Sequence, residues 1–135
     1  MTTLFADTSF FVAYLSDRDE AHAWAVEYMT HSTDRIQTSE WILAELGNYL
    51  AEGRNRRLFG PLVRALYDES RFEIAGADSI PFLEAFELYV RRADKGWSFT
   101  DCTSFRLMKA RRITDALTTD QHFAEAGFRV LLTAK

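Results

Sequence analysis

Four carboxylates in this sequence have apolar or small hydroxyl neighbours in place of other charges: Asp7, Glu45, Asp101 and Asp120. Like charges that share a pocket repel one another and raise each other's pKa unless a cation lies between them. Oxygen ligands suit hard divalent ions such as Mg²⁺ or Mn²⁺. Two such ions about 4 Å apart can activate a water and stabilise the leaving oxygen of a phosphodiester. The four residues therefore predict a metal-dependent hydrolase, provided that the fold brings them together.

The three aspartates also have a simpler interpretation as helix caps. Asp7 ends an apolar run and precedes a helix-compatible one, as an N-cap does. Ser98 with Asp101, and Thr118 with Gln121, have the spacing of a capping box. Taken singly, each aspartate is explained as a cap, and only the set of four indicates a metal site.

Short apolar runs that alternate with helical patterns predict the elements that would position these residues. Strands are expected at residues 3–6, 35–38, 72–75, 114–117 and 128–132. Helices are expected after Asp7 and at residues 21–29, 40–52, 56–69, 79–93, 98–112 and 121–126, with Asp78 or Ser79 capping the fifth and Pro61 marking a kink or a later start in the fourth. This alternation predicts an α/β fold with a largely parallel sheet and right-handed crossovers.

In such a sheet, Asp7 and Asp120 both follow a strand, so both are expected at the edge where the strands' carboxyl ends meet. Asp101 opens a helix that should start at the same edge. The neighbouring hydroxyl side chains are expected to orient the carboxylates; they belong to Thr8, Ser9, Thr118 and Thr119.

Composition limits the protein class. The chain has 135 residues, the size of one domain, expected to span residues 1–135. Its net charge of −4 argues against a broadly basic nucleic-acid binder but allows local basic patches. A single cysteine, Cys102, permits no internal disulfide and is expected to be a small buried side chain. Because the sequence has neither a signal peptide nor a membrane span, a cytoplasmic protein is expected.

Basic residues cluster in two patches of the sequence. One patch contains Arg54, and the other contains Arg106 and Lys109. Either patch could hold RNA phosphates near the acidic site, although Arg and Lys on helices most often form a solvated face. Of the three histidines, only His122 is near a candidate site, and a polar surface role is expected for it.

The acidic segments resemble, in order and spacing, the motifs of the PIN domain. They are Asp7-Thr8-Ser9 after the first strand, Glu45 at the end of Ser39–Glu45, Ser98–Asp101, and Thr118–Phe123. The resemblance covers nearly the whole chain, and no acidic position of the family pattern is missing. It implies a PIN-like three-layer α/β/α sandwich with a mainly parallel central sheet.

The resemblance also implies an activity, that of a Mg²⁺- or Mn²⁺-dependent ribonuclease that cuts RNA internally. Asp7, Glu45, Asp101 and Asp120 would bind one or two ions, and a metal-activated water would attack the phosphodiester. A PIN chain of this size is most similar to the VapC-type toxins of bacterial toxin–antitoxin pairs. That likeness implies a homodimer and a cognate antitoxin that fills the active-site groove.

Rival interpretations fit less well. A haloacid-dehalogenase-like phosphatase needs a second Asp two residues after the first, where this chain has Ser9. A receiver domain has no place for Glu45 within a helix. Two alternatives stay open: a non-catalytic PIN-like interaction module, and a PIN nuclease with a housekeeping role outside toxin–antitoxin pairs.

Overall fold

The structure is a computed structural model that describes residues 2–132; residue 1 and residues 133–135 of the expected domain lie outside the described part. The strands are β1 (Thr3–Ala6), β2 (Arg35–Ser39), β3 (Phe72–Ala75), β4 (Asp115–Leu117) and β5 (Arg129–Val130). The helices are α1 (Thr8–Leu15), α2 (His22–His31), α3 (Glu40–Tyr49), the 3₁₀ turn η1 (Gly53–Asn55), α4 (Arg56–Asp68), α5 (Phe82–Arg91), α6 (Phe99–Arg111) and α7 (Gln121–Glu125).

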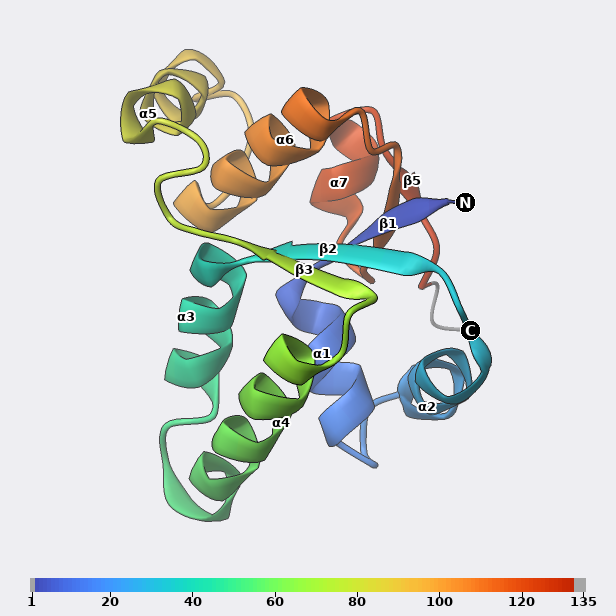
Figure 1. Ribbon diagram of the computed structural model, residues 1–135. Coiled ribbons are helices and arrows are strands. Elements are labelled where there is room, and N and C mark those ends of the chain that lie inside the picture. The colour runs from blue at the N-terminus through green and yellow to red at the C-terminus, as the bar shows by residue number, and fades with distance from the viewer. Residues whose placement is uncertain (1, 133–135) are drawn as a thin grey trace.

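The five strands form one parallel sheet in the order β3-β2-β1-β4-β5. Helices α1 to α4 cover one face of the sheet, and α5 to α7 cover the other (Figure 1). The predicted α/β sandwich with a mainly parallel sheet is therefore confirmed. None of the helices within residues 2–132 combines the length and the hydrophobicity needed to cross a bilayer.

The position of β1 at the centre of the sheet explains why Leu4–Ala6 form a continuous apolar run. Leu4 pairs with Ile36 of β2 on one side, and Phe5 pairs with Ala116 of β4 on the other. Both faces of a parallel sheet are covered by helices, so side chains that point to either face are buried. Phe5 and Ala116 are fully buried, which places the core around the strand that leads to Asp7.

Several predicted element ends were wrong. Helix α3 ends at Tyr49, three residues early, because the chain turns through Gly53, which has a φ of +68°. Pro61 lies inside α4 and neither kinks it into two elements nor delays its start. The amphipathic face with Leu62 and Leu66 buried outweighs the one hydrogen bond that Pro61 removes.

The ends of α5 and β5 also differ from prediction. Helix α5 begins at Phe82, because Pro81 has an extended ψ of 134° and takes the N-cap position. Asp78 and Ser79 therefore lie in the preceding turn and cap no helix. Strand β5 is only Arg129–Val130, since the neighbouring β4 offers just three residues for pairing.

Candidate metal centre

The sheet topology brings the two strand-end aspartates together. Strands β1 and β4 are neighbours, and the chain leaves β1 toward β2 on its other side. Such a reversal of strand order opens a crevice beyond the carboxyl ends of the strands. A hollow of about 290 Å³ lies there, and its lining includes Asp7, Glu45 and Asp120.

Asp7 occupies the N-cap position of α1, but its side chain makes no capping hydrogen bond. Its Oδ2 instead accepts hydrogen bonds from Thr118 Oγ1 at 2.8 Å and from Ser9 Oγ at 3.2 Å. Both bonds reach the same oxygen, which leaves Oδ1 available for a cation. The cap interpretation of Asp7 is therefore wrong, and the strand-to-helix junction aims the carboxylate at the hollow.

The predicted hydroxyl side chains form a connected network around the carboxylates. Ser9 Oγ lies 3.0 Å from Thr118 Oγ1 and accepts the backbone N–H of Thr119 at 3.1 Å. Thr8 Oγ1 donates to Glu45 Oε1, which ties the start of α1 to α3. Thr119 contributes through its backbone, and none of the side-chain hydrogen bonds found within residues 2–132 involves its hydroxyl.

Asp101 is both a cap and a member of the acidic cluster. Ser98 Oγ accepts the backbone N–H of Asp101 at 3.0 Å, and Asp101 Oδ2 accepts the backbone N–H of Ser98 at 3.0 Å. This capping box was predicted from the spacing and is confirmed. The same Oδ2 lies 3.0 Å from Nδ1 of His122, which joins the start of α6 to α7.

Asp120 is the N-cap of α7, with its Oδ1 accepting the backbone N–H of His122 at 2.9 Å. The predicted capping box of Thr118 with Gln121 is therefore wrong. Thr118 Oγ1 accepts the backbone N–H of Asp120 at 3.0 Å instead, so it holds both Asp7 and the Asp120 backbone.

Burial and repulsion from neighbouring carboxylates disfavour the charged forms of Asp7 and Asp101. Burial raises the pKa of Asp7 to about 6, a hydrogen bond from Thr118 opposes the rise, and the charges of Asp101 and Glu45 add to it. Burial also raises the pKa of Asp101. The hydrogen bond from the Ser98 backbone opposes this rise, and the charge of Asp120 adds to it. A divalent cation among these carboxylates would relieve both costs.

The structure adds His122 and Asp19 to the site. Atoms of Asp101, Asp120 and His122 that could ligate a metal lie within 4.8 Å of one another. Burial would lower the pKa of His122, but its hydrogen bond to Asp101 and the charge of Asp120 raise it overall. Asp19 lines the hollow from the turn after α1, where its Oδ1 accepts the backbone N–H of Ala21 at 2.9 Å.

Sequence reasoning had a signal for His122, which is two residues beyond Asp120, but assigned it a polar surface role. No local signal marked Asp19, because it lies in a run of charged residues that reads as a solvated turn. Cys102 is fully buried, and burial raises the pKa of its thiol to about 11, so it is the inert side chain that was predicted.

The basic residues lie outside the acidic hollow. Arg54 lines a separate cavity beside it, while Arg106 and Lys109 line another hollow, next to Trp97. Arg106 also pairs with Glu84 at 3.3 Å. A role in RNA binding for these three residues stays a prediction.

The donor set fits a hard divalent ion. Carboxylates come from α3 and from the strand end after β1 on one side, and from α6 and the start of α7 on the other. The set is rich in oxygen, has one imidazole nitrogen and has no thiolate, since Cys102 lies buried within α6. Such a set matches the preference of Mg²⁺ or Mn²⁺ for oxygen ligands.

Comparison with known proteins agrees with this geometry. The family model of the PIN domain matches residues 4–129. The 23S rRNA-specific endonuclease VapC20 of Mycobacterium tuberculosis, from strain CDC 1551 and from strain H37Rv, is 31% identical over 127 residues, which cover 93% of this chain and 95% of that protein. The crystal structure of Mycobacterium tuberculosis VapC20, described as a sarcin–ricin loop cleaving toxin, superposes with a TM-score of 0.84 and 26% identity, covering 95% of this chain and 98% of that one.

Proposed function

The chain belongs to the PIN-domain family, and from that premise we propose that it is a divalent-metal-dependent endoribonuclease acting as the toxin of a VapBC-type toxin–antitoxin pair. One observation carries the proposal: carboxylates from both helical layers face one hollow at the carboxyl edge of the sheet. A non-catalytic interaction module would have no use for a cluster of four acids in which burial disfavours the charged forms of Asp7 and Asp101.

Asp7, Glu45, Asp101 and Asp120 are proposed to hold the metal, either Mg²⁺ or Mn²⁺, as one or two ions. When bound, such an ion activates the attacking water and stabilises charge on the scissile phosphate. The protein's own part is to orient the ligands. Thr118 and Ser9 hold Asp7 in place.

The proposed substrate is structured ribosomal RNA. VapC20 is named for its action on 23S rRNA and cleaves the sarcin–ricin loop. Because nearly the whole length of both chains aligns, we propose the same loop as the first target to test. Cleavage in a bacterial cell would place the protein in the cytoplasm, where ribosomes are.

Two partners are proposed: a cognate antitoxin, by likeness to VapC-type toxins, and a second copy of this chain. The second copy has support from α5, whose exposed face carries large apolar side chains that are 42–67% accessible: Phe82, Leu83, Phe86, Tyr89 and Val90. Exposed apolar patches of this kind mark interaction surfaces.

The decisive experiment is cleavage of a synthetic sarcin–ricin loop hairpin and of total RNA, with Mg²⁺, with Mn²⁺ and with EDTA. Wild-type protein should cut internally, only with metal. Asp7→Asn and Asp101→Asn should each reduce the rate by at least about 100-fold, since even partners of metal ligands are worth about 10–100-fold. Asp68→Asn, an exposed carboxylate at the end of α4, is the matched control and should cut normally.

No cleavage of either RNA with either metal would refute the nuclease, as would equal rates for wild type and both Asn variants. Expression in a bacterial host separates the toxin from a housekeeping nuclease. Growth arrest on expression of wild type, relieved by Asp101→Asn, supports a toxin, whereas normal growth with an active enzyme assigns a housekeeping role.

A further inference from the structure

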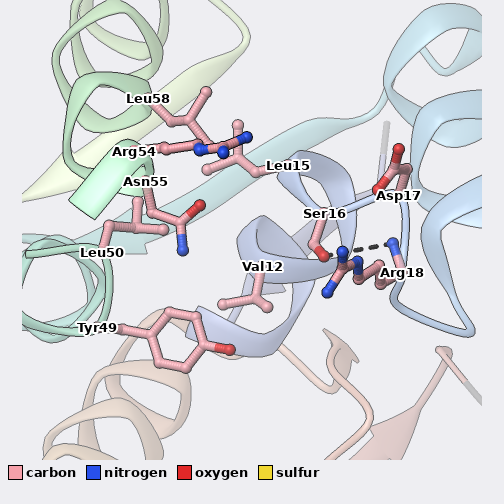
Figure 2. A pocket seen from close by; sticks show the side chains of 10 residues that line it. All are labelled: Val12, Leu15, Ser16, Asp17, Arg18, Tyr49, Leu50, Arg54, Asn55 and Leu58. Carbon is pink, nitrogen blue, oxygen red and sulfur yellow. Dashed lines mark hydrogen bonds between the residues drawn. The ribbon is translucent and has the colours of Figure 1, made fainter. Parts of the chain in front are cut away.

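A second cavity, of about 570 Å³, adjoins the acidic hollow and contains none of the four proposed metal ligands in its lining, as far as residues 2–132 show. It lies between the end of α1, the end of α3 and the turn η1 that leads into α4 (Figure 2). Cavities of roughly 300–1,000 Å³ are the size that takes small organic groups. Its volume therefore suits one or two nucleotides.

The cavity adjoins the proposed catalytic hollow. Val12 and Tyr49 line both of them, and they come from α1 and from the last turn of α3. The carboxylates of Asp7 and Glu45 line the acidic hollow that shares these two residues with the cavity. A polymer bound at the carboxylates would therefore run directly into the cavity.

The charge of the cavity complements a phosphate backbone. Arg18 and Arg54 enter it from different sides (Figure 2), and neither forms an ion pair with a carboxylate in the part of the chain that the structure describes. Among the described residues, Asp17 is the one carboxylate that lines it. Guanidinium groups bind phosphate with two parallel hydrogen bonds, and in a chain with a net charge of −4 such free cations stand out.

Tyr49 supplies a surface on which a base can stack. Its side chain is 64% exposed, and its ring lies at the rim between the two hollows, beside Val12 (Figure 2). Proteins that bind unpaired RNA stack bases on aromatic rings and bond the base edges with polar side chains. Asn55, whose amide reaches into the same cavity, is such a polar side chain.

We propose that this cavity is a nucleotide subsite for the RNA that flanks the scissile phosphate, with Tyr49 stacking on a base and Arg54 and Arg18 contacting phosphates. The inference rests on the proposed ribonuclease function. Six of the ten lining residues have polar side chains, a mixture that suits a nucleotide better than an apolar protein segment.

Binding of the sarcin–ricin hairpin tests the subsite, measured by fluorescence anisotropy with the full chain in an Asp101→Asn background so that the RNA stays intact. Tyr49→Leu, which loses the ring, and Arg54→Gln should each weaken binding by about 5–30-fold. Tyr49→Phe keeps the ring and should bind as the parent does. Arg54→Gln should also reduce the slope of log affinity against log salt by about 1.

Two controls match these changes. Arg35→Gln removes an exposed cation at the amino end of β2, the opposite edge of the sheet, and Tyr67→Leu removes an exposed ring on α4. Both should bind within twofold of the parent. Thermal unfolding of each variant confirms that it folds.

Affinities for Tyr49→Leu and Arg54→Gln that equal those of the controls would overturn the subsite, even if wild type cleaves RNA. Loss of binding in these variants, together with an inactive wild type, would show that the cavity binds RNA but would refute the nuclease, and with it the position of the subsite beside a scissile phosphate. Absence of RNA binding by the parent would overturn both. Unchanged RNA affinity with loss of a copurifying protein would assign the cavity to that protein and also overturn the proposal.

Discussion

Asp7 is a buried carboxylate for which the fold provides hydrogen bonds but no cation. Thr118 and Ser9 donate to it, while none of the ion pairs found within residues 2–132 includes it. Burial is the main reason that its pKa rises from 3.8 to about 6. The fold therefore keeps at this position a group whose charge destabilises the metal-free protein, as expected where stability is exchanged for ligand binding.

Because the charged Asp7 side chain destabilises the metal-free fold, we expect Asp7→Asn to be more stable than wild type. The folded state binds the Asp7 proton more tightly than the unfolded chain, so the free energy of unfolding falls as pH rises from 3.8 to above 6. In EDTA at about pH 7.5, Asp7→Asn should be more stable than wild type by up to about 3 kcal/mol, and the difference should shrink to about a third at about pH 4.5. Urea unfolding of both proteins at the two pH values measures this difference in unfolding free energy.

Mg²⁺ supplies the control, because it should stabilise wild type and not Asp7→Asn, which reverses the order of stability. An Asn variant that is equally destabilised at both pH values would show that Asp7 is structural and that its charge carries no cost.

Helix starts position two of the other proposed ligands, Asp101 and Asp120, whereas Glu45 lies within α3. Helix α6 begins with the capping box of Ser98 and Asp101, and α7 begins with the cap of Asp120. In both, a carboxylate that satisfies free backbone N–H groups also belongs to the acidic cluster: Asp120 lines the hollow, and Asp101 lies beside Asp120 and His122. The macrodipole of α6 favours the negative charge at its first turn. Cap and ligand are therefore compatible roles.

The start of α6 offers a test at this scale. Ser98→Ala removes the hydroxyl that accepts the Asp101 N–H, and we expect a loss of about 1 kcal/mol in unfolding free energy. Because Asp101 is then held less firmly, the Mg²⁺ concentration for half-maximal cleavage should also rise, by about 10-fold.

Ser98→Thr keeps a capping hydroxyl and should restore both values. A Ser98→Ala protein that loses stability while its Mg²⁺ requirement stays that of wild type would show that the cap supports the helix alone.

At the scale of the whole molecule, α5 exposes an apolar face on the helical layer opposite α1 to α4 (Figure 1). Phe82 of this face contacts the ring of Phe99 at the start of α6, with centroids 5.0 Å apart. Phe99 is two residues from Asp101, so a subunit seated on α5 would lie close to the metal centre. The proposed dimer face and the candidate metal centre are in this way neighbours in the fold.

A charge on this face should separate the proposed dimer. Leu83 is 67% exposed, so Leu83→Glu leaves the core of the monomer intact and introduces a charge that an apolar interface would have to bury. Light scattering with size exclusion should then report a dimer for wild type and a monomer for Leu83→Glu.

Tyr67→Glu, at a 58% exposed position on α4, is the control and should stay dimeric. A wild-type monomer at every concentration, or a Leu83→Glu dimer, would exclude this face as the interface.

By itself the sequence determined the order of elements and the parallel α/β class, and it supplied the four acidic positions that are proposed to bind metal. These follow from local patterns: apolar runs such as Leu4–Ala6, the Ser39 cap confirmed by its bond to Ile42 N–H, and the Ser98 box. The ends of the elements were less predictable. They depend on the backbone angles at Pro81 and Gly53, and neighbouring residues help to set those angles.

Only the tertiary structure decided which polar groups meet. Thr118 reaches Asp7 across 111 residues of sequence, and Thr8 reaches Glu45 across 37. Such contacts depend on strand order, which places β4 beside β1, and local pattern carries no information on that order. For the same reason Asp19 and His122 joined the site, and Tyr49 met Arg54 at a cavity, without any signal in their own segments strong enough to predict it.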